Sequence, residues 1–338
     1  MKVTTTYAWA ERVDGLEDVG PLRARPRRAG GHGTVEMSRD QLIGYRRATP
    51  DDALACHELM WESVTDLGRR QGSPLEGTAD DWWRSSEPLH GLLARIATEW
   101  LVAEETDSGR LVGFARSIER DGLLELTEFF VRPDQQSRGV GKALLERAFP
   151  AGRGTVRSII ATSDVRAQAR YYAAGTVARF PLFTLGGVPD DPEPIHNVMA
   201  ESIDGERAIE AQRAVEGTVL GHRRSDDEVR WLLDRRQGHL YRRADRVIGF
   251  SFLGRDGAGP MAALDASELP AILLHVEGLA HSLGLERLEL QVPGPNAVAI
   301  RHLMGRGFRF DSWINILMSD RPFGQFDRLI PFSPPLFL

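Results

Sequence analysis

The chain has 338 residues, a length that predicts two domains. A formal net charge of −6 argues against a general nucleic-acid binder, and a single cysteine, Cys56, excludes an internal disulfide framework. No apolar run is long enough to cross a membrane and the N-terminus lacks an apolar signal core, so we expect a cytoplasmic protein.

The first unit is predicted to be a mixed α/β sheet with helices on its faces. Residues 1–41 are rich in Gly, Pro and Arg, and we interpret them as an N-terminal extension. Over residues 42–186, apolar positions recur with the period of a strand or of a helix. The expected strands are 43–48, 99–106, 110–119, 123–131, 156–163 and 179–187, and the expected helices are 53–64, 86–99, 139–148 and 164–175.

A second unit follows a linker at residues 187–197 that is dense in Pro and Asp. Helices and strands alternate again over 198–320, and residues 321–338 form a C-terminal tail rich in Phe and Pro. The predicted fold class is therefore α/β (α+β), with two mixed, mostly antiparallel sheets flanked by helices.

An internal repeat supports this division. The segments "DVRAQARYYAAGT" and "NAVAIRHLMGRGF" align without gaps, with Asp164 on Asn296, Tyr171 on Leu303 and Gly175 on Gly307. Each segment predicts a helix with a capping residue at its start and a glycine at its end. Duplication explains the two copies better than chance does.

The stretch "QQSRGVGKALL", residues 135–145, places two glycines directly before a helix. Backbone N–H groups at the start of a helix form an anion-binding seat, and glycine lets a phosphate oxygen approach the backbone closely. Arg138 and Lys142 add positive charge beside Gly139 and Gly141. The pattern therefore indicates a phosphate-binding turn.

Two common phosphate-binding motifs do not fit this turn. A P-loop would need glycine where Gln136 stands, and a Ser or Thr in place of Ala143. A dinucleotide-binding fingerprint would need a third glycine where Leu144 stands.

The pattern Gln-x-x-Gly-x-Gly after the strand that ends in "FFVRP", together with the Asp-x-x-Ala-x-x-x-Tyr-x-x-x-Gly helix, resembles the GCN5-related N-acetyltransferase (GNAT) family. The resemblance is good over 43–186 and weaker over 198–320. It implies that acetyl-CoA is the cosubstrate and that no metal is needed. The expected cofactor-binding residues are Phe130, Val131, Gln136, Ser137, Arg138, Gly139, Val140, Gly141, Lys142, Asp164 and Tyr171.

The resemblance also implies direct transfer of an acetyl group to a primary amine. Family members carry acidic residues on the strand "LLELTEFFV", which offers Glu128 as the first candidate for the base and Glu125 as the second. Their odd separation puts them on opposite faces of a regular strand, unless a bulge intervenes. Tyr171 takes the position of the family's proton donor to the thiolate, while Asp164 and Thr176 replace the usual Asn and Phe.

The second unit lacks the glycine turn and carries Leu303 in place of the tyrosine. We therefore expect it to be degenerate and to supply structure or a wall of the acceptor pocket. The expected partner is a small-molecule amine, with no nucleic acid and no membrane, and a homodimer is compatible with the resemblance. Two alternatives stay open: a non-catalytic sensor or assembly protein that binds CoA, and an acetyltransferase acting on peptide or protein N-termini.

Overall fold

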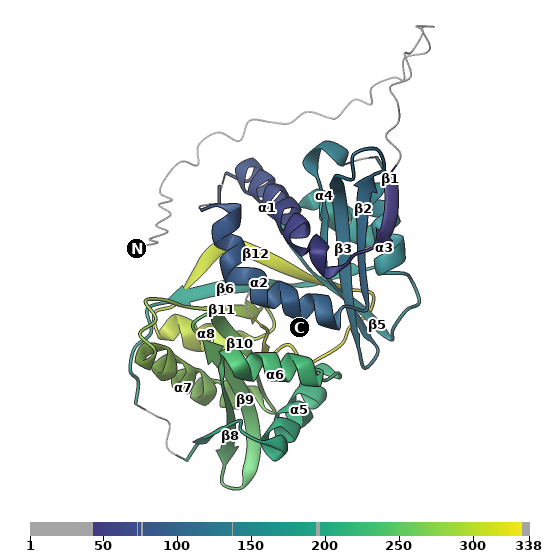
Figure 1. Ribbon diagram of the computed structural model, residues 1–338. Coiled ribbons are helices and arrows are strands. Elements are labelled where there is room, and N and C mark those ends of the chain that lie inside the picture. Colours follow the sequence, from purple (N-terminus) through teal and green to yellow (C-terminus); the bar gives the residue numbers. More distant parts are fainter. Residues whose placement is uncertain (1–42, 73, 76, 137, 194–196, 333–338) are drawn as a thin grey trace, which may run out of the picture. The chain divides into compact units, whose positions relative to one another are not determined.

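The structure is a computed structural model that describes residues 43–332 except 73, 76, 137 and 194–196 (Figure 1). The expected extension, 1–41, lies outside the described residues. The described residues belong to one unit, Gln41–Leu338.

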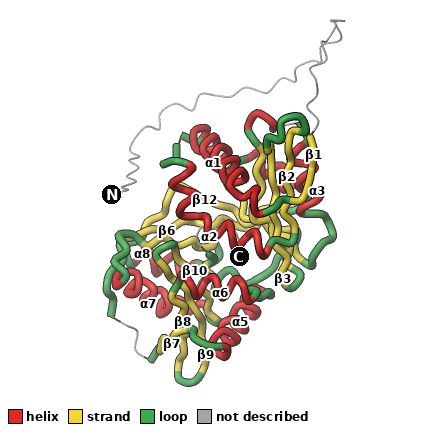
Figure 2. Tube along the Cα trace, viewed as in Figure 1, coloured by secondary structure: helices red, strands yellow, loops and turns green. Residues whose placement is uncertain are grey.

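Two sheets organise the chain (Figures 1 and 2). The larger has eight strands in the order β1-β2-β3-β4-β5-β12-β6-β11, and the smaller has five in the order β13-β10-β9-β8-β7. The first-half strands are β1 (Ile43–Arg47), β2 (Glu99–Glu105), β3 (Leu111–Arg120), β4 (Leu123–Val131), β5 (Val156–Ala161) and β6 (Val177–Gly187). The remaining strands are β7 (Met199–Ser202), β8 (Gln237–Arg243), β9 (Arg246–Gly254), β10 (Gly257–Ala263), β11 (Leu288–Pro293), β12 (Arg309–Ser319) and β13 (Leu329–Ile330).

Helices cover both faces of the larger sheet. The helices are α1 (Ala53–Arg70), α2 (Ala79–Ile96), α3 (Val140–Ala148), α4 (Val165–Ala173), α5 (Glu206–Leu220), α6 (Asp226–Arg235), α7 (Leu269–Ser282) and α8 (Ala297–Gly305). Helix α1 packs its buried residues on Trp100 and Val102, whereas α3 packs on Leu101 and Ala103. Because alternate residues of a strand point to opposite faces, α1 and α3 lie on opposite sides of the sheet.

Most of the expected elements are confirmed, and α2 is longer than expected. Thr78 caps α2 by accepting a hydrogen bond from the Asp81 N–H, so Trp82 and Trp83 lie in the first turns of that helix. The sequence analysis did not predict α5, β7, β10 or β13.

The two halves do not form self-contained sheets. Strand β12, from the second half, lies between β5 and β6, and β11 pairs with β6 at the sheet edge. The expected two sheets flanked by helices are confirmed, but the sequence did not predict that strands of the second half join the larger sheet, because local periodicity does not specify which strands pair. A shared apolar core joins the halves, with Leu89, Leu92 and Ile118 packed with Val215 and Phe250.

Two irregularities in β4 shape the site. The register between β3 and β4 shifts at Thr127, which leaves an extra residue in β4 and marks a β-bulge. Strand β4 is parallel to β5 and pairs with it only from Leu123 to Leu126, so the two strands diverge beyond Leu126. The divergence opens the sheet next to the glycine turn.

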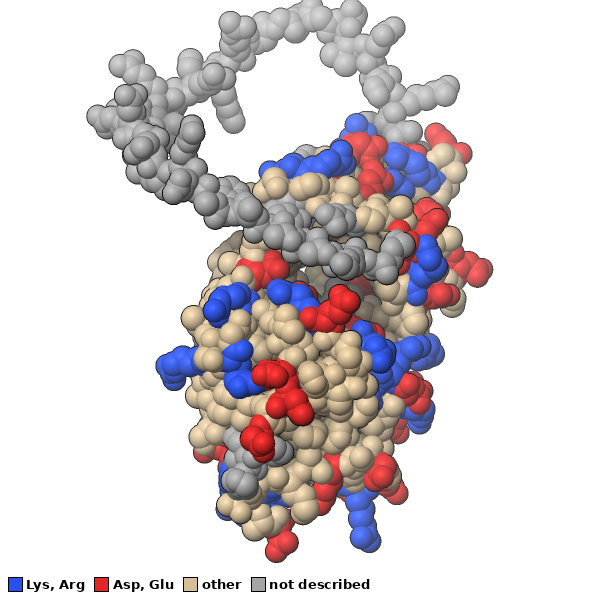
Figure 3. All heavy atoms as spheres, turned by 90° about the vertical axis from the view of Figure 1, so that its left-hand side faces the viewer, with Lys and Arg blue, Asp and Glu red and all other residues tan. Residues whose placement is uncertain are grey.

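The surface in Figure 3 carries Lys and Arg side chains interspersed with Asp and Glu. Mixed charge of this kind is typical of a solvated surface. Among the described helices, none combines the length and apolarity that crossing a membrane would require.

Candidate active site

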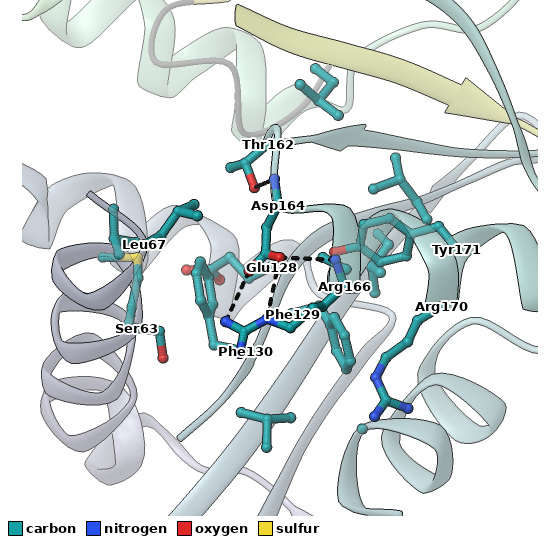
Figure 4. Close-up of a pocket in the computed structure, with 18 of the residues that line it drawn as sticks. Ser63, Leu67, Glu128, Phe129, Phe130, Thr162, Asp164, Arg166, Arg170 and Tyr171 are labelled. Carbon is teal, nitrogen blue, oxygen red and sulfur yellow. Dashed lines mark hydrogen bonds and ion pairs between the residues drawn. The ribbon is translucent and has the colours of Figure 1, made fainter. Parts of the chain in front are cut away.

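A cavity of about 570 Å³ opens where β4 and β5 diverge. Its walls come from α1, β4, β5, α4 and β12. Figure 4 shows Ser63 and Leu67 of α1 on one side, Tyr171 and Arg170 of α4 on the other, and Glu128 and Phe129 of β4 between them. A cavity of this size and placement can hold an extended small molecule.

The glycine turn leads into this cavity. Gly139 caps α3 with a φ of 92°, a left-handed conformation that glycine adopts without strain. At Gly141 an added Cβ would lie 3.0 Å from the Phe129 ring, so this glycine lets α3 pack closely on β4. The Gln136 side chain donates a hydrogen bond to the Val131 carbonyl and ties the turn to the end of β4. The N-terminus of α3, with its positive dipole end, is thereby held at the cavity.

The other residues expected at the turn differ in exposure. Arg138 and Lys142 are exposed, Val140 is buried under α3, and Ser137 lies outside the described residues. Lys142 is 3.7 Å from Glu146 on the same helix, a contact between two exposed side chains that leaves the ammonium accessible.

The main-chain N–H of Val131 points toward the gap between β4 and β5. Arg132 donates its N–H to Val112 of β3, and successive N–H groups of a strand alternate in direction. The Val131 N–H therefore faces away from β3, where β5 has already diverged. Of the two main-chain donors expected, Phe130 and Val131, only that of Val131 is directed into the opening.

Glu128 lines the cavity, and an arginine and a histidine hold its carboxylate. Its Oε2 atom lies 2.7 Å from Arg116 Nη1 and its Oε1 atom lies 3.4 Å from His90 Nδ1, and all three side chains are buried. Burial raises the pKa of Glu128, but Arg116 and His90 outweigh this effect and the pKa is lowered. The carboxylate therefore stays charged at neutral pH.

His90 belongs to a buried group that includes His57 and Trp83. The His90 ring stacks on Trp83 and meets the edge of His57, whose Nε2 lies 2.9 Å from the Ala79 carbonyl. Neither His90 Nε2 nor His57 Nδ1 has a hydrogen-bond partner among the described residues. A buried water molecule could satisfy such atoms.

The bulge at Thr127 places Glu125 on the same sheet face as Glu128. Arg116 and Arg120 are four residues apart on β3 and so point to the same face of the sheet. Arg116 contacts Glu128, and Arg120 contacts Glu125. Glu125 is fully buried, lies 2.6 Å from Arg120 and is not among the residues that line the cavity. The structure thus brings Glu128, and not Glu125, to the cavity.

Tyr171 is buried at the cavity wall with its ring edge-on to Phe129, 6.0 Å between centroids. Burial, with a further contribution from the charge of Asp164, raises its pKa, so the phenol keeps its proton. Thr176, which replaces the family's Phe, donates its hydroxyl to the Tyr171 carbonyl at 2.8 Å and fixes the end of α4.

Asp164 caps α4 by accepting a hydrogen bond from the Arg166 N–H. Its carboxylate also lies 3.0 Å from Arg70 of α1 and 3.4 Å from Arg166 of α4, so charged side chains link α1 to α4 beside the cavity. The Asp164 side chain is thus already engaged within the protein.

Sequence analysis did not identify several residues of this site. Arg116 and His90 hold Glu128, Arg170 places its Nε 3.5 Å from the Cβ position of Gly141, and Trp313 and Asn315 reach the cavity from β12. Arg116 had a signal, because it is a charged residue directly after the apolar run 111–115 of β3. Trp313 had none, because its position depends on the pairing of β12.

Helix α7 of the second half occupies the place that α3 has in the first half, and acidic residues precede it. Helix α7 follows Glu268, whose carboxylate pairs with Arg243 at 2.7 Å, and Asp265 lies just before it. Two carboxylates at this point repel an anion. Among the described residues, no His, Cys, Asp and Glu side chains gather in a group of three that could hold a metal ion.

Comparisons with known proteins agree with this architecture. Residues 97–175 match the family "Acetyltransferase (GNAT) domain", and no curated protein sequence matches the chain. A Pyrococcus horikoshii protein assigned as an acetyltransferase has a similar structure, with a TM-score of 0.66, 14% identity and coverage of 88% of this chain and 96% of that one.

Two further solved structures share the fold. A GCN5-related N-acetyltransferase from Sphaerobacter thermophilus aligns with a TM-score of 0.56 and 17% identity over 83% of this chain and 96% of that one. A tandem GNAT protein from the clavulanic acid biosynthesis pathway aligns with a TM-score of 0.53 and 14% identity over 83% of this chain and 99% of that one. Residues 97–175 thus match the GNAT acetyltransferase domain, and the chain around them has the fold of a tandem GNAT protein.

Proposed function

We propose that this protein is an acetyl-CoA-dependent N-acetyltransferase that acts on a primary amine of a small molecule, with the chemistry in the first half of the chain. The observation that carries the proposal is the glycine turn at α3, which opens into the gap between β4 and β5 beside Glu128 and Tyr171.

The residues of the turn suit a diphosphate-bearing carrier. Acetyl-CoA would supply an activated thioester. The N-terminus of α3, with Arg138, Lys142 and Arg170 around it, provides donors and positive charge for the diphosphate. The open backbone at Gly139 leaves room there, because nothing lies within 4 Å of its Cβ position. The Val131 N–H is placed to donate to a carbonyl oxygen that gains negative charge.

We assign Glu128 the role of binding the acceptor amine and relaying its proton. An alkyl ammonium has a pKa near ~10.4, so it must lose a proton before it can attack. A carboxylate with a lowered pKa is a weak base, and we therefore assign Glu128 to hold and orient the ammonium and to relay its proton through water.

We assign Tyr171 the role of donating a hydrogen bond to the sulfur of the departing CoA thiolate. Its raised pKa keeps the hydroxyl protonated, which suits donation of a hydrogen bond to a thiolate more than complete transfer of the proton. Solvent then protonates the released thiolate.

The second half is assigned a structural role and one wall of the acceptor pocket. The acidic entrance to α7 is unsuited to a diphosphate, and Leu303 stands where Tyr171 stands in the first half. Strand β12 carries Trp313 and Asn315 into the cavity of the first half.

Release of free thiol from acetyl-CoA, measured with a panel of amines, tests the proposal. Glu128→Gln should lower kcat/KM for the amine about 100-fold, and Tyr171→Phe should lower kcat about 10-fold, the size expected for one hydrogen bond to a charged atom. The affinity for acetyl-CoA, measured by calorimetry, should change less than threefold in both variants.

Tyr172→Phe is the matched control, because Tyr172 is adjacent but exposed. This variant should retain wild-type rates. Tight binding of acetyl-CoA without turnover of any amine would favour the sensor alternative. Turnover of peptide N-termini in preference to small amines would favour the alternative acceptor.

A further inference from the structure

We propose that the acceptor is a monoamine with an apolar, aromatic body, bound against Trp82 of α2 and Trp313 of β12. This inference rests on the proposed transfer reaction, and it concerns which class of amine the cavity selects.

The acceptor end of the cavity has an apolar wall. Helix α1 contributes Met60, Val64 and Leu67, which recur at helical spacing and so form one face, with Ser63 beside them. The two tryptophans also line the cavity, as does Phe130 of β4. A wall of this composition binds apolar and aromatic groups.

Both tryptophans are held in place by the protein. The Trp82 ring meets the edge of Trp61 of α1, 5.0 Å between centroids. The Trp313 indole N–H donates to Asn315 Oδ1 at 3.2 Å, and Asn315 is buried. Aromatic surfaces that are fixed before binding lose little conformational freedom when a ligand stacks on them.

The charges of the cavity disfavour a polycation. Among the described residues that line it, the acidic ones are Glu128 and Asp164. Arg116 neutralises Glu128 at 2.7 Å, and Arg70 and Arg166 neutralise Asp164 at 3.0 and 3.4 Å. A polyamine or an aminoglycoside would place several positive charges beside these arginines, whereas a single ammonium needs one carboxylate, Glu128, which it would share with Arg116.

Trp313 reaches the cavity because β12 is irregular. The five residues of β12 from Phe310 to Ile314 lie opposite only three residues of β6, Leu185 to Phe183, so residues 311–313 bulge out of the ladder. A bulge re-aims the side chains that it contains. The second half of the chain therefore takes part in acceptor selection through this bulge.

Calorimetric titration of the full-length protein, saturated with CoA, tests the inference without requiring turnover. The probes are 2-phenylethylamine, spermidine and kanamycin. We expect 2-phenylethylamine to bind at least 10-fold more tightly than either polycation, and Trp313→Ala to weaken its binding at least 10-fold while CoA affinity changes less than threefold. Phe310→Ala, an exposed aromatic on the same strand that does not line the cavity, is the control and should leave binding unchanged.

Val64→Glu gives an independent test, because it adds an unpaired carboxylate to the α1 face. This variant should bind 2-phenylethylamine more weakly and spermidine more tightly than the wild type does. The ratio of the two affinities should therefore fall by at least 10-fold. Equal or tighter binding of spermidine or kanamycin to the wild type would overturn the inference, as would an unchanged affinity in Trp313→Ala. If 2-phenylethylamine binds through Trp313 but is never acetylated, the transfer proposal fails and the binding inference stands.

Discussion

At the scale of single residues, the ion pair between Arg116 and Glu128 decides what the site can do. Both side chains are buried, and the pair lies in the wall of the cavity. Removing either member of a buried pair leaves the other charge uncompensated, which is costly.

We predict that Arg116→Met lowers the free energy of unfolding by about 3–5 kcal/mol at pH 7. The pH dependence should also reverse in sign. In the wild type the pKa of Glu128 is lowered on folding, so its contribution to stability is present above the unfolded value of ~4.3 and is lost as the pH falls through the folded pKa. In Arg116→Met, burial raises that pKa, so stability should fall as the pH rises above ~4.3.

Urea denaturation between pH 2 and 8 measures both effects, because the wild-type contribution is lost below ~4.3 and that of the variant above it. Glu128→Gln is the control, because it removes the titrating group and should flatten this part of the pH profile. An Arg116→Met variant whose stability rises with pH in the same way as the wild type would contradict the assignment.

At the scale of elements, the entrance to α3 combines a left-handed glycine with a helix N-terminus at the mouth of the cavity. Gly139 has a φ of 92° and open space at its Cβ position. Any side chain there strains the left-handed backbone and so lowers stability. An acidic side chain also places negative charge next to the proposed diphosphate site and so weakens binding of the diphosphate.

We predict that Gly139→Asp weakens CoA binding at least 100-fold, because its carboxylate would repel the phosphates. Gly152→Asp is the matched control: Gly152 also has a positive φ, of 80°, and open space, but it follows the end of α3. Both variants should lose similar thermal stability, and only Gly139→Asp should lose CoA affinity by calorimetry. Equal CoA affinity in the two variants would refute the assigned turn.

At the scale of the whole molecule, the exchange of strands joins the two halves. Strand β12 lies between β5 and β6, and Arg120 of β3 lies 3.2 Å from Glu228 of α6 and 2.6 Å from Glu125. The Trp231 indole N–H of α6 donates to the Pro88 carbonyl of α2. Neither half can unfold without breaking the ladder and the core of the other.

We therefore predict one cooperative unfolding transition for the full chain. Cys56 is the single cysteine and is buried, with a pKa raised to about 12, so its labelling by a thiol reagent reports the opening of the first half. Far-UV circular dichroism reports both halves. The two probes should give the same midpoint in urea, and labelling well before the loss of helical signal would show that the halves unfold separately.

Much of the fold could be predicted from the sequence. The positions of most strands and helices, the two capped helices of the repeat and the glycines that end them, Gly175 and Gly307, are confirmed. Asp164, Asn296 and these glycines act within a few residues of the chain, so their effects are visible in local patterns. Glu128, Gln136 and Tyr171, which the motif singled out, line one cavity, and their roles stay predictions.

The sequence by itself determined the glycine turn, the order of the elements and the family resemblance, because each depends on residues that are close together in the chain. Only the tertiary structure decided the bulge at Thr127, the pairing of Glu128 with Arg116 and His90, and the entry of Trp313 from the second half. These features depend on strand register and on contacts between distant segments, which the free energy of the whole fold selects and no local pattern encodes.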